Sequence, residues 1–286
     1  MSVAGDSVRG MISEALPDDL QKLFRGTKGE GRALSVALPA GRLVLPDEGE
    51  GETPVLWLSD QPATAELYGA LRAEHARSGL YPLLLDALHK TDPEYRPWGC
   101  GELFLDRLTS PDSHDPAAVL AGWWPDGGDQ DDEEGSDAMA PFDTRWPGLA
   151  AAAPLRHDPE LLADAFAQQL LTEDPHLRLG LVAATTGAAA LTAVGWSGPL
   201  NHDNDTARFS AVVGDWERRF GVRVVGVGFA TLRLSVAAPP ASPDAALAVA
   251  AEHLAFCPDN IWQGVGSVAA YAEMLVDENE WYFWWD

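Results

Sequence analysis

The N-terminal part of the chain alternates between short apolar runs and amphipathic helical patterns. Residues 54–60 (PVLWLSD) are typical of a buried strand, residues 61–78 of a helix with one apolar face, and residues 80–88 (LYPLLLDAL) of a second buried strand. A strand, a helix and a strand at this spacing predict a βαβ unit with two parallel, neighbouring strands. Residues 33–38 and 41–46 flank a Pro-Ala pair, which predicts a hairpin.

Residues 155–286 show the same two patterns in a more regular succession. Strand patterns occupy 177–184, 222–229, 231–238 and 281–286, and helical patterns occupy 159–171, 187–196, 205–220, 242–256 and 267–276. Apart from the first helix, the order is β-α-β-β-α-β with an extra helix beside each principal one. This order predicts a split βαβ, or ferredoxin-like, domain.

An acidic tract separates the two parts. Residues 126–137 hold seven Asp or Glu residues interleaved with Gly and Ser, a composition that cannot bury enough apolar surface to offset its ordering entropy. We therefore expect an α/β (α+β) protein of two domains. The N-terminal α/β domain spans residues 1–125, an acidic linker or loop spans 126–147, and the C-terminal domain spans 155–286. A length of 286 residues fits about two domains.

The charge balance excludes some partners. The chain has 19 basic and 44 acidic residues, a formal net charge of −25, so nucleic acid and anionic membrane surfaces would be repelled. The uncharged stretch 179–202 is rich in Ala and Gly and fits a strand and a helix better than a membrane span. Only two cysteines are present, Cys100 and Cys257, and the first thirty residues have no signal-peptide pattern. We expect a cytoplasmic protein.

The last six residues, WYFWWD, are the most unusual segment. On a strand, Trp281, Phe283 and Trp285 would face one way, and Tyr282, Trp284 and Asp286 the other. One interpretation is a central strand that packs against helices on both faces. The alternative is that one face is an aromatic platform for a ligand or a protein partner, with the Asp286 carboxylate and the chain end beside it.

A second candidate cluster lies at the end of a predicted helix, at residues 252–260 (EHLAFCPDN). His253 and Cys257 are four residues apart and share a helical face, a spacing that suits metal ligands or a Cys-His nucleophile pair. The alternative is a purely structural role, with a buried thiol and a histidine that forms a hydrogen bond with the end of the helix. Two ligands do not make a zinc site, so we expect no metal and no cofactor.

The loop at residues 196–202 (WSGPLNH) is the third candidate, and Arg218 and Arg219 on the following helix are natural partners for carboxylates such as the chain end. Together the three regions give twelve candidate ligand-binding or partner-binding residues. They are Trp196, Asn201, His202, Trp216, Arg219, Glu252, His253, Cys257, Asp259, Asn260, Trp284 and Asp286.

Several short stretches also resemble one known family. They are WERRFG (216–221), VVGVGF (224–229), AAPP (237–240), AEHLAFCPDN (251–260), YAEML (271–275) and the terminal WYFWWD. In combination they resemble a bacterial family known only as domain of unknown function 4253, over about residues 175–286. The resemblance implies a domain boundary and a bacterial cytoplasmic origin, and it implies no activity, cofactor or catalytic residue.

These observations leave three functional hypotheses. The chain contains no P-loop, nucleophile elbow, HExxH, dinucleotide-binding glycine motif or EF-hand loop. We therefore expect a protein-binding or regulatory module, such as an immunity-like or adaptor protein, whose acidic surface attracts a basic partner. The first alternative is a metal-dependent or thiol-dependent enzyme that uses Glu252, His253 and Cys257. The second is a small-ligand sensor with a pocket between the two domains, where Trp196, Trp216 or Trp284 contacts an apolar ligand.

Overall fold

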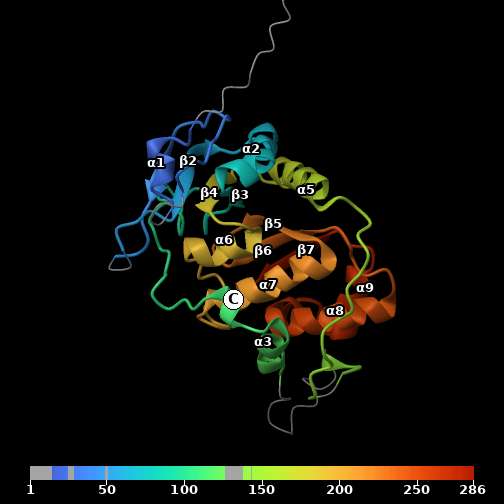
Figure 1. Cartoon of the computed structure of the whole chain (residues 1–286). Helices are drawn as coiled ribbons and strands as arrows, with labels where there is room; N and C mark the ends of the chain where they lie inside the picture. The colour runs from blue at the N-terminus through green and yellow to red at the C-terminus, as the bar shows by residue number, and fades with distance from the viewer. Residues whose placement is uncertain (1–14, 25–28, 49–50, 126–137, 143) are drawn as a thin grey trace, which may run out of the picture.

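Seven strands form one mixed sheet in the order β1-β2-β4-β3-β5-β6-β7 (Figure 1). The structure is a computed structural model that describes residues 15–24, 29–48, 51–125, 138–142 and 144–286. The strands are β1 (Gly41–Val44), β2 (Leu56–Pro62), β3 (Leu80–Leu85), β4 (Arg178–Ala183), β5 (Val222–Val227), β6 (Thr231–Val236) and β7 (Glu280–Trp284). Both halves of the chain therefore contribute to a single sheet, and the acidic residues 126–137 lie outside the described ranges.

Helices cover both faces of this sheet. The N-terminal half holds α1 (Asp18–Gln21), α2 (Ala65–Ser78), the 3-10 turn η2 (Pro111–Ser113) and α3 (Pro116–Trp123). The C-terminal half holds α5 (Pro159–Glu173), α6 (Gly187–Val194), α7 (Thr206–Phe220), α8 (Pro243–Phe256), the π-helical turn η3 (Asn260–Val265) and α9 (Val268–Leu275). None of the helices within the described ranges is long and apolar enough to cross a membrane.

Two apolar cores lie on opposite faces of the sheet. The larger core gathers the buried faces of α3, α6, α7, α8 and α9, and the smaller core those of α1, α2 and α5. Strand β3 contributes to both, because alternate side chains of a strand point to opposite faces. Tyr81, Leu83 and Leu85 enter the larger core, whereas Leu80 and Leu84 enter the smaller one. Its apolar sequence is therefore that of a central strand, as expected.

The two strands of the expected βαβ unit are parallel, as predicted, but they are not neighbours in the sheet. Strands β2 and β3 run parallel to each other, yet β4 lies between them and pairs antiparallel with both. The hairpin expected between residues 33–38 and 41–46 is also wrong, because β1 pairs antiparallel with β2. The strands at 41–44, 56–62 and 80–85 were identified correctly, but residues 33–38 form no strand and contribute only an isolated bridge between Ala33 and Ala15.

The strand order of the C-terminal half is not ferredoxin-like. Its elements follow the expected β-α-β-β-α-β order, but β3 from the N-terminal half lies between β4 and β5. Because β3 pairs antiparallel with β4 and parallel with β5, these two strands run in opposite directions. In a split βαβ unit the two strands joined by a helix are parallel, so β4 and β5 cannot form one. The expected topology is therefore corrected to one shared seven-stranded mixed sheet.

Strands β3 and β5 separate at the amino end of β3. They pair only at Leu84 with Gly226 and at Leu85 with Val227, although both strands begin several residues earlier. Pro82 lies in the unpaired part and has no N–H to donate to a neighbouring strand. The hydroxyl of Tyr81 crosses the gap instead and donates a hydrogen bond of 2.9 Å to the Val224 carbonyl. The sheet thus has an opening that polar side chains can line.

Because β3 belongs to both cores, we predict that the two halves unfold together. Leu84 is fully buried, so Leu84→Ala should lower the free energy of unfolding by about 2–5 kcal/mol. Leu161→Ala on the exposed surface of α5, where 70% of Leu161 is accessible, should change it by less than about 0.5 kcal/mol. Urea unfolding followed by tryptophan fluorescence and by far-ultraviolet circular dichroism should give coincident transitions. Two separate transitions, with only one of them shifted by Leu84→Ala, would contradict a shared core.

Candidate functional site

The aromatic chain end is part of the larger core. Strand β7 is an edge strand. The side chains of Trp281, Phe283 and Trp285 point from its inner face into the core and are buried. Phe283 stacks on Trp216 with their ring centroids 5.5 Å apart. Neither sequence interpretation fits fully, because β7 is not central and its more aromatic face is not accessible. On the outer face Tyr282 and Asp286 are exposed, and Trp284 is half-buried.

Several of the predicted residues hold this last strand in place. The Asn260 side chain pairs with the free edge of β7, donating to the Tyr282 carbonyl at 2.5 Å and accepting from the Trp284 N–H at 3.2 Å. It therefore takes the place of a neighbouring strand and covers an exposed edge. The backbone of Asp286 donates to Asp259 at 3.1 Å and accepts from Asn201 at 2.6 Å. These contacts give the polar residues around the chain end a structural role.

His253 and Cys257 do not form a reactive pair. Nδ1 of His253 lies 3.2 Å from the Tyr271 hydroxyl, whereas the Cys257 thiol donates to the Trp284 carbonyl at 2.9 Å. Both residues are fully buried. Burial, with a smaller effect of the Arg219 charge, lowers the pKa of His253 to about 3, and burial raises the pKa of Cys257 to about 12. At neutral pH the imidazole and the thiol are therefore both uncharged, and the thiol is a poor nucleophile.

In the predicted loop, Trp196 belongs to the core and His202 is half-buried. Nε2 of His202 lies 2.9 Å from the Ala255 carbonyl, and burial lowers the pKa of this imidazole. The indole N–H of Trp196 donates to the Gly228 carbonyl at 2.9 Å, and its ring packs edge-on against Trp285. No group of three or more His, Cys, Asp or Glu side chains within the described ranges could hold a metal ion.

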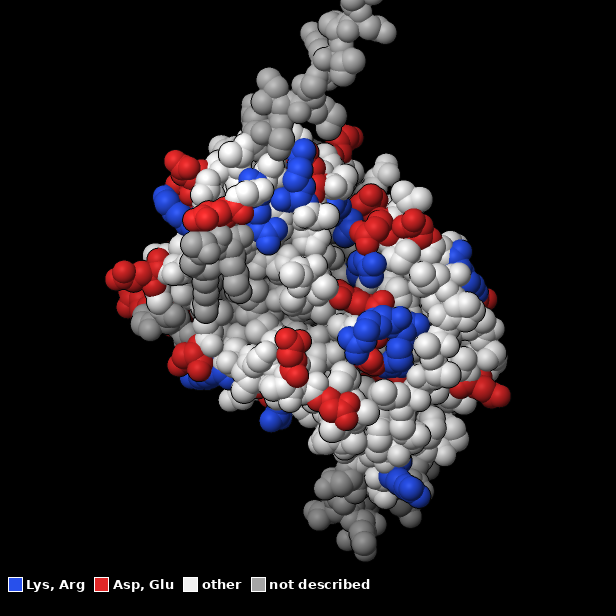
Figure 2. Space-filling model, viewed as in Figure 1, with Lys and Arg blue, Asp and Glu red and all other residues white. Residues whose placement is uncertain are grey.

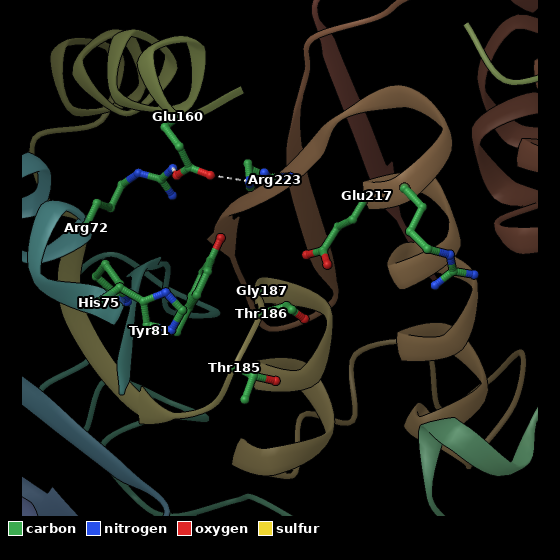
Figure 3. Close-up of a pocket in the computed structure, with 11 residues that line it drawn as sticks. Arg72, His75, Tyr81, Glu160, Thr185, Thr186, Gly187, Glu217 and Arg223 are labelled. Atoms are coloured by element: carbon green, nitrogen blue, oxygen red, sulfur yellow. Dashed lines mark hydrogen bonds and ion pairs between the residues drawn. The ribbon is translucent and has the colours of Figure 1, made fainter. Parts of the chain in front are cut away.

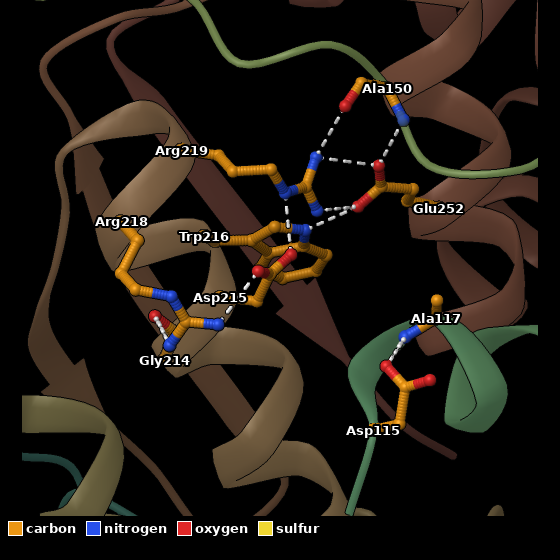
Figure 4. Close-up of polar contacts among 9 residues, drawn as sticks. All are labelled: Asp115, Ala117, Ala150, Gly214, Asp215, Trp216, Arg218, Arg219 and Glu252. Atoms are coloured by element: carbon orange, nitrogen blue, oxygen red, sulfur yellow. Dashed lines mark hydrogen bonds and ion pairs between the residues drawn. The ribbon is translucent and has the colours of Figure 1, made fainter.

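Glu252, Arg219 and Trp216 form one buried hydrogen-bonded group (Figure 4). Two nitrogens of the Arg219 guanidinium donate to the Glu252 carboxylate at 2.9 and 2.6 Å, and the indole N–H of Trp216 donates to it at 2.7 Å. The Ala150 N–H donates to the same carboxylate, and the Ala150 carbonyl accepts from Arg219. Arg219 therefore pairs with Glu252 on α8, and not with the chain end. The group joins α7, α8 and the segment that precedes α5.

A cavity lined by several charged side chains lies elsewhere, at the opening between β3 and β5. We call it the β3–β5 cleft, and it has a volume of about 290 Å³. Its lining comes from six elements and from the connection between β4 and α6. The lining residues are Arg72, His75, Tyr81, Pro82, Glu160, Thr185, Thr186, Gly187, Glu217, Arg218 and Arg223. None of the twelve residues predicted from the sequence is among them.

Two arginines share one carboxylate on one side of the β3–β5 cleft (Figure 3). Arg72 on α2 donates to one oxygen of Glu160, and Arg223 on β5 donates to the other at 2.7 Å. The Arg72 side chain is only 4% exposed, whereas that of Glu160 is 59% exposed. Glu160 can therefore move into solvent, but the Arg72 guanidinium is held inside the protein. On the face seen in Figure 2, basic and acidic side chains meet in this region.

Glu217 faces the same space from α7. Its carboxylate accepts a hydrogen bond of 3.0 Å from the Ala188 N–H, in the first turn of α6. Burial raises the pKa of Glu217, and the Ala188 N–H and the Arg223 charge oppose that shift only in part. Gly187 lets the start of α6 pack closely against Tyr81, because a Cβ atom at this position would lie 2.7 Å from the Tyr81 hydroxyl oxygen. A carboxylate thus occupies the positive end of a helix, inside a cleft that also holds arginines.

The signals for this cleft in the sequence are weak. Thr185, Thr186 and Gly187 break an apolar stretch, and Glu217 and Arg218 lie in the motif WERRFG. No spacing rule connects these residues to Arg72 or Glu160, because they meet only through the pairing of β3 with β4 and β5.

Neighbouring arginines on α7 offer a matched test of the buried group. Arg219→Ala leaves the fully buried Glu252 without its cation, so it should lower the free energy of unfolding by about 3–5 kcal/mol. Arg218→Ala should change it by less than about 1 kcal/mol, because the Arg218 side chain is 68% exposed in its pair with Asp215. Urea denaturation of both variants measures the difference. Equal losses would show that the buried pair is not a principal support of the fold.

The two cysteines should differ in reactivity. Cys100 is exposed and Cys257 is buried, so a thiol reagent such as dithionitrobenzoate should label one thiol in the native protein and two in concentrated guanidinium. The Cys100→Ser variant should show almost no labelling until it is denatured. Rapid labelling of Cys257 in the native Cys100→Ser protein would contradict the buried, protonated thiol and restore the thiol-enzyme hypothesis.

The comparisons with known proteins concern the C-terminal part of the chain. No curated protein and no solved structure matches this chain. The matching family model is described as Domain of unknown function (DUF4253), and it covers β4 to the chain end, including Glu217 and Arg223. Arg72, Tyr81 and Glu160 lie before the match, so the β3–β5 cleft combines this domain with the preceding residues. Residues 178–286 of the chain are therefore a DUF4253 domain.

Proposed function

We propose that the chain is a small-ligand sensor whose β3–β5 cleft binds a small molecule carrying an oxyanion, such as a carboxylate, sulfate or phosphate group. The observation that carries this proposal is the buried Arg72 guanidinium, held beside Arg223 in a cleft of a strongly acidic protein. Holding an arginine charge inside a protein is costly unless anions compensate it. Here Glu160 and Asp164 compensate Arg72, the latter at 2.8 Å. Three arginines (Arg72, Arg218 and Arg223) thus line one cleft in a chain whose net charge is −25.

The chemistry of the lining favours an oxyanion over other groups. Guanidinium groups bind planar carboxylates and phosphates through paired hydrogen bonds. Glu160 already accepts one hydrogen bond from each of Arg72 and Arg223, and its exposed position allows a ligand to replace it. The hydroxyls of Thr185 and Thr186 add hydrogen-bonding groups on the other side. A volume of about 290 Å³ lies at the small end of ligand sites, which favours a metabolite over a large cofactor.

The position of the cleft suits a sensor. Its walls come from α2, β3 and α5 on one side and from α6, α7 and β5 on the other. A ligand that contacts both sides adds an interaction between segments far apart in the sequence. Such a ligand stabilises the folded chain to the extent that it binds this arrangement of the two sides more tightly than any other state of the chain.

The net charge of −25 supports a second candidate function. A surface with this charge steers basic proteins toward it, which suits an immunity-like or adaptor module. Trp281, Phe283 and Trp285 are buried and cannot form the contact surface. A partner would instead meet carboxylates and half-exposed side chains such as Trp284. Capture of one stoichiometric basic protein that is lost on Trp284→Ala would favour this candidate.

The proposed oxyanion site predicts a selective response to anions. At constant ionic strength, sulfate, phosphate or citrate should raise the melting temperature above that in sodium chloride. Arg223→Ala should weaken binding of the best anion by about 10- to 100-fold, because it removes a charged hydrogen-bond donor. Arg208→Ala is the matched control, since Arg208 lies on α7 and pairs with Asp203 outside the cleft. If no anion stabilises the protein, or if both variants bind equally, the proposed function fails.

A further inference from the structure

Glu217 occupies the position that an incoming oxyanion would take. Its carboxylate accepts the Ala188 N–H in the first turn of α6, within the β3–β5 cleft. Backbone N–H groups at the start of a helix are the usual donors to bound phosphates and carboxylates. Figure 3 shows the Glu217 side chain reaching from α7 into the space opposite Tyr81. The protein thus supplies its own anion at this point of the cleft.

Two anions cannot share this space without a large electrostatic cost. Arg223 lowers the energy of the Glu217 charge, whereas Glu160 raises it. The charged or titratable side chains that line the cleft together with Glu217 are Arg72 and His75 on α2, Tyr81 on β3, Glu160 on α5, Arg218 on α7 and Arg223 on β5. A dianion such as sulfate that replaces Glu160 between the arginines brings two negative charges in place of one, so it increases the repulsion on the Glu217 carboxylate. Protonation of Glu217 removes this repulsion at the lowest cost in free energy, because burial already favours the neutral acid.

We propose that Glu217 makes oxyanion binding in the β3–β5 cleft proton-linked. In the ligand-free protein the Glu217 carboxylate holds the first turn of α6. When an oxyanion binds, one proton from solvent is transferred to Glu217, and the neutral carboxylic acid no longer repels the ligand. The ligand then takes the Ala188 N–H and the arginines. This inference rests on the proposed function and adds its regulation, because the occupancy of the cleft would depend on both the anion concentration and the pH.

The direction of the pH dependence follows from the charge. Protonated Glu217 becomes more abundant as the pH falls toward its raised pKa, so the affinity for an oxyanion should increase with acidity. One proton per ligand limits the change to tenfold in Kd for each pH unit. Above the pH at which Glu217 is fully ionised in both free and bound protein, the affinity should become constant.

Isothermal titration calorimetry with sulfate tests this inference, because sulfate remains a dianion between pH 5 and pH 8. The wild-type protein should bind sulfate at least tenfold more tightly at pH 5 than at pH 8. Titrations in buffers of different ionisation enthalpy should show proton uptake on binding. Glu217→Gln keeps the size of the side chain and removes its charge, so this variant should bind more tightly than wild type at pH 8 and lose most of the pH dependence.

His75 is the matched control, because its side chain lines the same cleft. His75→Gln should retain the pH dependence of the wild type. Binding of sulfate that is independent of pH, or equal pH dependence in wild type and Glu217→Gln, would overturn the role of Glu217 and leave the oxyanion site in place. Absence of sulfate binding in the wild type and in Glu217→Gln at every pH, together with no response to phosphate or citrate, would instead remove the proposed function itself.

Discussion

The buried pair between Arg219 and Glu252 is the interaction on which the arrangement of the C-terminal half depends. A carboxylate with no solvent exposure is stable only when hydrogen bonds and an opposite charge compensate it. Here Trp216, Arg219 and the backbone of Ala150 all bond to it. Burial disfavours the charge of Arg219, but its bonds to Glu252 and Asp215 outweigh that effect and raise its pKa. The pair therefore sets the rotation of α7 against α8.

The orientation of α7 then decides what the β3–β5 cleft contains. With Trp216 and Arg219 turned toward α8, Glu217 faces α6 and Arg218 faces solvent. On the opposite wall, the sheet opens because Pro82 cannot donate to β5, and Tyr81 crosses the gap. The cleft thus follows from two constraints in different halves of the chain. This origin explains why a DUF4253 domain alone, residues 178–286, supplies only one side of it.

The sequence predicted the elements well and their pairing poorly. The apolar run at β3 correctly indicated a central strand, since its side chains enter both cores. The ferredoxin-like order failed because strand order depends on which edges meet, and β3 enters between β4 and β5. Predicted sites followed residue types that are rare in proteins, such as tryptophan, and the His253–Cys257 spacing. Trp196, Trp216, His253 and Cys257 proved to be buried, whereas Trp284 is half-buried. The cleft residues have ordinary local contexts and converge only through the sheet, so no local motif reveals them.

Hydrogen–deuterium exchange with and without sulfate is the measurement that tests the central claim most directly. If the β3–β5 cleft is the oxyanion site, sulfate should slow exchange in the peptides that cover residues 184–190 and 218–224. It should leave the strand at residues 280–284 unchanged, because that strand lies at the far edge of the sheet. Protection confined to residues 257–286, or no protection anywhere despite measurable binding, would contradict the assignment and return attention to the aromatic chain end.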